Sequence, residues 1–143
     1  MNKQMSLSFI HDELKEVKTH KREFLEKMDS ILPWEQLYEL VKPCYYEGAR
    51  GNKPYDLELM LRIHLIQNLY DLSDEGTRNE IIDSRAFSDF CEVESSNQIP
   101  DGDTIGRFRN LLIKNHIHEQ FFAVVVKTLT DRGLILKKGT IVD

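Results

Sequence analysis

Three polar side chains, Arg107, Asn110 and Lys114, follow one another at spacings of three and four residues. At about 100° per residue these positions share one face of an α-helix, and Asp103 falls on the same face. Arginine, asparagine and lysine can reach base edges and phosphates in a DNA major groove, so this face is a candidate nucleic-acid contact. An ordinary solvated helix face is the competing interpretation. The opposite face gathers the apolar side chains of Ile105, Phe108 and Leu112.

The residues before this face predict where its helix begins. Pro100 disfavours helix just before it, and Asp101 or Asp103 can accept hydrogen bonds from the first free amides. Upstream lie a helix that Ser73 can cap, a second short helix and a polar linker over residues 92–98. This succession is compatible with a helix-turn-helix variant whose turn is longer than usual.

Arg109 lies at the flank of the apolar face, where an internal carboxylate is an alternative partner for it. Two further cations, Arg50 and Lys53, lie in a segment rich in glycine and tyrosine, residues 44–55, which predicts a loop. Such a loop can follow a phosphate backbone, and a solvated loop is the alternative. The basic run over residues 18–22 is a weaker candidate of the same kind.

The histidines and cysteines do not have the spacing of a metal site. His64 lies in a strongly apolar stretch, which predicts a core histidine, whereas His116 and His118 are two residues apart and should point away from each other on a helix. Cys44 and Cys91 are far apart and fit a reducing cytoplasm better than a disulfide scaffold. We therefore expect no metal ligands, and we find no nucleophile with its base.

Hydrophobic periodicity predicts a mainly α, multi-helix domain over residues 1–133. The stretch 56–70 is apolar on almost every side, which indicates a buried central helix. Other helices are predicted over residues 7–28 and from Pro33, where Trp34 is expected to anchor the core and Pro43 to end the helix. A last apolar helix should end near Gly133.

The final residues, 134–143, differ in kind. They are rich in leucine, isoleucine and valine around a Lys-Lys-Gly turn, so they predict the first strand or hairpin of a sheet. A sheet that begins in the last ten residues of a helical chain has few strands to pair with. We therefore expect a second, truncated domain over residues 134–143.

Composition bounds the classes of function. The chain has 143 residues, 41% of them hydrophobic and 30% charged, as in an ordinary soluble domain. Its net charge of −5 provides no global attraction to nucleic acid, so any DNA contact must use a local patch. Neither a secretory pattern nor a run of about 20 apolar residues occurs, so we expect a cytoplasmic protein with no membrane partner.

Six short runs, taken together and in order, resemble the N-terminal part of bacterial insertion-sequence transposases of the Asp-Asp-Glu type. The resemblance covers the chain from about Leu32 to its end. The runs are Leu32-Pro33-Trp34-Glu35, Gly51-Asn52-Lys53-Pro54-Tyr55, Leu59-Met60-Leu61-Arg62, Leu72-Ser73-Asp74-Glu75, Ile99-Pro100-Asp101 through Arg107-Phe108-Arg109, and Gly139-Thr140-Ile141-Val142-Asp143.

The resemblance implies a helical region that binds the terminal inverted repeats of the element, followed by an RNase H-like catalytic domain. In that family two aspartates and a glutamate hold two Mg²⁺ ions, and Asp143 matches the first of these acids. The sequence ends at Asp143, before the other two acids, and has Asn52 where the family has a basic residue. One carboxylate cannot hold two Mg²⁺ ions, so we expect this chain alone to need no cofactor and not to cut DNA.

Two functions follow as expectations. The first is a non-catalytic, DNA-binding module for the double-stranded ends of a transposon, with Arg107, Asn110 and Lys114 in the groove and Arg50 and Lys53 on phosphate. The second is a protein-interaction module that forms a homodimer, or joins an intact transposase and inhibits it. The net charge favours the second function slightly.

Overall fold

The structure is a computed structural model, and it describes residues 18–47 and 55–134. These residues form seven α-helices and one short 3-10 helix and contain no strand, which confirms the prediction of a mainly helical domain. The predicted β segment lies outside the described residues from position 135 onward. The helices are α2 (His20–Ile31), α3 (Trp34–Glu47), α4 (Leu57–Leu69), α5 (Asp74–Asp83), α6 (Arg85–Phe90), α7 (Gly102–Lys114) and α8 (Ile117–Asp131), and the 3-10 helix is η1 (Ser96–Gln98).

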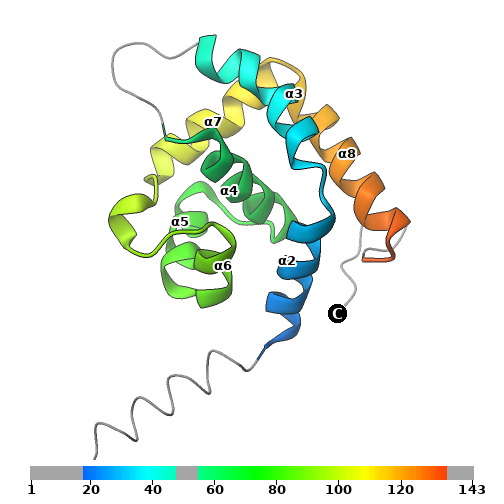
Figure 1. Cartoon of the computed structure of the whole chain (residues 1–143). Helices are drawn as coiled ribbons and strands as arrows, with labels where there is room; N and C mark the ends of the chain where they lie inside the picture. Colours follow the sequence, from blue (N-terminus) through cyan, green and yellow to red (C-terminus); the bar gives the residue numbers. More distant parts are fainter. Residues whose placement is uncertain (1–17, 48–54, 135–143) are drawn as a thin grey trace, which may run out of the picture.

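Helix α4 lies in the middle of the fold, with the other helices packed around it (Figure 1). Leu65 and Ile66 are fully buried, and even the polar Gln67 is only 4% exposed. The apolar pattern on every side of residues 56–70 therefore predicted a central helix correctly. Helices α3, α5 and α7 all contact α4, so packing against α4 helps to fix the position of α7.

Short polar side chains cap the first turns of four described helices, α2, α5, α6 and α7. Ser73 accepts a hydrogen bond from the Gly76 amide at 2.9 Å, as its position predicted. At α7 the alternative between two aspartates is resolved, since Asp101 accepts from the Thr104 amide at 2.8 Å. Each such bond satisfies one of the free amides in a first helical turn.

Pro43 does not end α3 as predicted, because α3 continues through it to Glu47. Pro43 is exposed, so the carbonyl that loses its backbone partner at this turn can turn toward water. The last turn is held instead by tertiary contacts of Tyr45. Its ring packs edge-on against Phe108 of α7, with 5.6 Å between centroids, and its hydroxyl donates to the Tyr55 carbonyl. Within residues 44–55, the loop therefore starts later than predicted.

Arg62 of α4 ties several helices together. Its Nη1 donates to the Phe90 carbonyl at 2.9 Å and its Nη2 to the Asp29 carboxylate at 3.0 Å. Its guanidinium also lies 4.3 Å from the ring centroid of Trp34. Trp34 is half-buried rather than enclosed, and it anchors this junction through an indole N–H that donates to the Asp29 carbonyl at 2.9 Å.

Candidate nucleic-acid interface

Helix α7 presents the polar face predicted from the sequence. The helix lies along one side of the molecule (Figure 1). Arg107, Asn110 and Lys114 are all exposed. Asp103 is exposed on the same face. The apolar face is buried, with exposed fractions of 2% for Ile105, 5% for Phe108 and 0% for Leu112.

The cations of this face are not used to hold the fold. Across residues 18–47 and 55–134, neither Arg107 nor Lys114 forms a salt bridge. The one bond of Arg107 runs from Nε to the Asp103 carbonyl at 3.4 Å, which leaves both terminal nitrogens of its guanidinium available. An unpaired arginine and lysine on the same helical face, about two turns apart, are suited to bind an external anion.

Arg109 points the other way and binds an internal carboxylate, which confirms the alternative partner proposed for it. Its Nε and Nη2 donate to the two oxygens of Asp74 at 3.1 and 2.9 Å. Gln67 adds a third bond to the same carboxylate at 2.8 Å. The hydrogen bond from Arg109 is the main reason why the pKa of Asp74 is lowered, and the bond from Gln67 adds to it, against an opposing effect of burial.

Two glycines of α7 let α5 lie directly against it. A Cβ atom on Gly106 would lie 2.7 Å from Oδ2 of Asp74, and one on Gly102 would lie 2.2 Å from Oε2 and 3.3 Å from Cα of Glu75. The close packing at these two glycines was not predicted from the sequence. The available signal was two glycines one turn apart inside a predicted helix, where each costs about 1 kcal/mol relative to alanine unless packing requires it.

The charge along α7 is uneven. Its first half borders a shallow hollow of about 620 Å³ whose lining includes Asp74, Glu75 and Asp103 as well as Arg107. The last turn carries Lys114, with no acidic residue at positions 110–118. The local positive charge therefore lies toward the C-terminal half of the helix.

The other predicted phosphate contacts receive no support from the described residues. In the basic run, Lys18 pairs with Glu26 at 2.8 Å and Arg22 with Asp89 at 2.8 Å. Lys21 lies 4.4 Å from the ring centroid of Phe87. These cations are thus engaged within the fold. Arg50, Lys53 and Asp143 lie outside the described residues.

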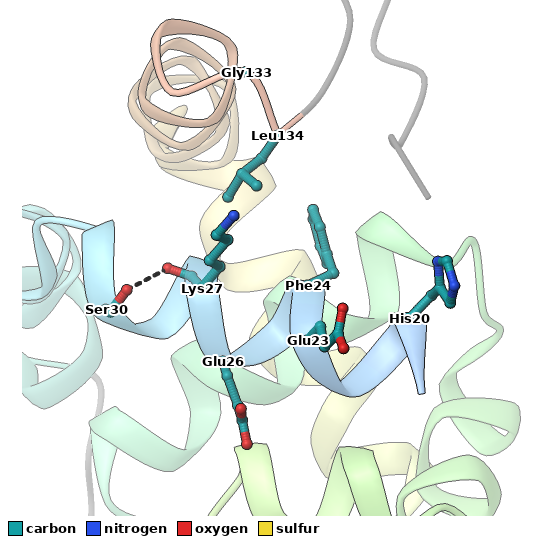
Figure 2. A pocket seen from close by; sticks show the side chains of 8 residues that line it. All are labelled: His20, Glu23, Phe24, Glu26, Lys27, Ser30, Gly133 and Leu134. Carbon is teal, nitrogen blue, oxygen red and sulfur yellow. Dashed lines mark hydrogen bonds between the residues drawn. The ribbon is translucent and has the colours of Figure 1, made fainter. Parts of the chain in front are cut away.

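A second hollow, of about 550 Å³, lies between α2 and the end of α8 (Figure 2). Figure 2 shows that Leu134 approaches Lys27 and Phe24, while the side chains of His20 and Glu26 point away from each other. Its polar groups therefore do not converge on one point, and it offers no arrangement for a reaction.

The buried side chain of His64 has a second histidine, His118, as a polar partner. Nε2 of His64 lies 3.0 Å from Nδ1 of His118, and His116 is exposed, so residues 116 and 118 point apart as predicted. Burial, and then the charges of His118 and Arg109, lower the pKa of His64 to about 3. Burial also lowers the pKa of His118. Within the described segments, no group of three or more histidine, cysteine or acidic residues could hold a metal ion.

Comparison with known proteins identifies the family to which this helical unit belongs. No solved structure matches the chain. None of the helices in residues 18–47 and 55–134 is both long and apolar enough to cross a membrane. Residues 12–111 match the family described as "Transposase domain (DUF772)", and this span includes α2 to α6 and most of α7. Because the match covers well over half of the sequence, the chain belongs to the transposase domain family DUF772.

Proposed function

We propose that this chain is the DNA-binding N-terminal region of an Asp-Asp-Glu type transposase and recognises the terminal inverted repeats of its element. Membership of the transposase domain family supports a role in transposition. The main support for a DNA contact is the exposed face of α7 that is formed by Arg107, Asn110 and Lys114, here called its outer face. In this proposal α7 is the recognition helix, and Arg107 and Asn110 read bases while Lys114 binds phosphate.

The packing of α7 supports a reading role because it restrains the helix. The bidentate contact between Arg109 and Asp74, and the glycine contacts with α5, hold α7 at a defined position. In the proposed helix-turn-helix variant, α5 supports α7, and α6 and η1 replace the usual short turn. The acids near the first half of α7 would repel phosphate, so we place the DNA backbone closer to Lys114.

We also propose that these 143 residues do not cut DNA by themselves. The resemblance assigns them only one of the three acids of the family, Asp143. A bound pair of Mg²⁺ ions would activate the attacking oxygen and stabilise the leaving oxygen. Such a pair needs more oxygen ligands than one carboxylate. Arg50 and Lys53 remain proposed phosphate contacts.

The test is fluorescence anisotropy with two duplexes, one carrying the terminal inverted repeat and one with the same bases in scrambled order. The wild-type chain should prefer the repeat. Arg107→Ala should cost about 1–3 kcal/mol for the repeat if Arg107 reads a base. Lys114→Ala should reduce the slope of log affinity against log salt by about one unit. Arg85→Ala, which removes an exposed arginine of α6, should change neither quantity.

Equal affinity for the repeat and the scrambled duplex, unchanged by Arg107→Ala, would contradict the DNA-reading role. The alternative function is a module that binds protein, which the net charge of −5 favours slightly. It predicts a different result. In that case the chain would ignore both duplexes and would increase the mass of an intact transposase in size-exclusion chromatography.

A further inference from the structure

Arg109 contacts Asn110 in a way that fixes the orientation of the Asn110 amide. Nη1 of Arg109 lies 3.3 Å from Oδ1 of Asn110. A guanidinium has only donors, so the amide oxygen must face Arg109 and the amide N–H₂ must face away. On an exposed residue of the outer face, this turns two donors toward a ligand.

The guanidinium that orients Asn110 is itself fixed. Its other two nitrogens bind Asp74, and Asp74 is bound in turn by Gln67, whose side chain is buried on α4. Gly106 brings the same carboxylate against the backbone of α7. Asn110 is therefore connected through two side chains to the centre of the fold.

We infer that Asp74 and Arg109 are positioning residues and that Asn110 is a specificity-determining residue that selects a guanine in the bound DNA. Guanine presents two acceptors in the major groove, N7 and O6, which suit an outward amide N–H₂. Adenine also requires an acceptor for its N6 amino group, and Arg109 already occupies one side of the Asn110 oxygen. This inference rests on the proposed function, in which α7 enters the groove.

The experiment replaces the guanines of the inverted-repeat duplex one at a time by 7-deazaguanine, which lacks the N7 acceptor. At one position the replacement should weaken binding of the wild-type chain about tenfold, within the range of a single base contact. Asn110→Ala should bind the normal and modified duplexes equally. Asn115→Ala is the matched control, because the Asn115 amide already donates to the Leu111 carbonyl at 2.8 Å, and it should retain the tenfold effect.

The positioning role is tested with Asp74→Asn and Arg109→Lys. Both should lose the effect of 7-deazaguanine, and neither should weaken binding to the scrambled duplex. Arg109→Lys keeps its charge, whereas Asp74→Asn removes an acid that repels phosphate, so its affinity for the scrambled duplex should equal or exceed that of the wild type. A residue that only stabilises the fold would instead weaken binding to both duplexes together. Circular dichroism shows which variants are folded, and Asn110→Ala changes only an exposed side chain, so it tests the inference even if the others unfold.

The outcomes separate this inference from the proposed function. If the wild-type chain does not prefer the repeat, both are wrong. If it prefers the repeat but no guanine position responds, or if Asn110→Ala still responds, only the choice of guanine by Asn110 is wrong. If Asp74→Asn and Arg109→Lys are folded and keep the full effect, the positioning role is wrong.

Discussion

Acidification is expected to destabilise the folded chain through the buried histidine pair. His64 is 1% exposed, and its pKa is lowered from 6.5 to about 3 by burial first and then by the neighbouring charges. Among the residues that the structure describes, the groups that surround His64 include no carboxylate that would stabilise a second proton on it, and Glu119 acts on the neighbouring His118 instead. The groups around His64 are Asn68 on α4, Phe108 and Arg109 on α7, and His118, Phe121 and Phe122 on α8.

The sign follows from proton uptake. The folded-state pKa of His64 lies below its unfolded value, so the unfolded chain binds more protons between about pH 3 and pH 6.5. The stabilisation is therefore present above pH 6.5 and is lost as the pH falls through this range. Between about pH 7.5 and pH 5 the loss is about 2 kcal/mol. The lowered pKa of His118 acts in the same direction, whereas the lowered pKa of Asp74 matters only below its ordinary value of 3.8.

Urea unfolding at the two pH values measures this loss, with the fluorescence of Trp34, the one tryptophan, as the signal. His64→Gln keeps an amide that can bind His118 but removes the titrating ring. It should be less stable than the wild type near pH 7.5 and should lose much less stability at pH 5. Equal free energies of unfolding for the wild type at both pH values would refute the reasoning. So would a His64→Gln variant that retains the full loss.

Two further substitutions test the packing around α7 and α4. Arg62→Ala removes the donor to the Phe90 carbonyl and should lower the free energy of unfolding by about 2 kcal/mol in a urea titration. The control Arg85→Ala, at an exposed position, should stay within about 0.5 kcal/mol of the wild type. Gly102→Ala places a Cβ 3.3 Å from Cα of Glu75, so it should lower the free energy of unfolding by about 1–3 kcal/mol. A thermal unfolding curve that matches the wild type would show that α5 can move away freely.

The helical framework was predictable because local chemistry decides it. The apolar circumference of α4 indicates burial without knowledge of any neighbour. The cap at Ser73 follows from residue type and position alone and forms the expected bond. At α7 the same reasoning limited the cap to Asp101 or Asp103, and Asp101 forms the bond. The same holds for the outer face of α7, because helical periodicity separates Arg107, Asn110 and Lys114 from the buried positions.

The features that position the candidate site depend on residues distant in sequence. Asp74 and Arg109 are 35 residues apart, and periodicity showed only that Arg109 was at the flank of a face. The extension of α3 past Pro43 likewise depends on Tyr45 meeting α7, which outweighs a local preference to stop. Sequence patterns give the faces of each helix, but the pairing of faces comes from the fold.

The charge on and around α7 determines what kind of DNA binding these residues can support. Arg107 and Lys114 add two positive charges, but Glu75 and Asp103 lie at the first half of the helix, and the chain as a whole carries −5. On a random duplex, where Arg107 has no matching base to read, phosphate contacts by Arg107 and Lys114 would give a salt slope of only about −2, and the net charge supplies no long-range attraction. Binding to random duplex through these residues should therefore be weak. A preference for the repeat must come from base contacts, so the ratio of the two affinities, rather than either affinity alone, distinguishes a DNA-end reader from a protein-binding module.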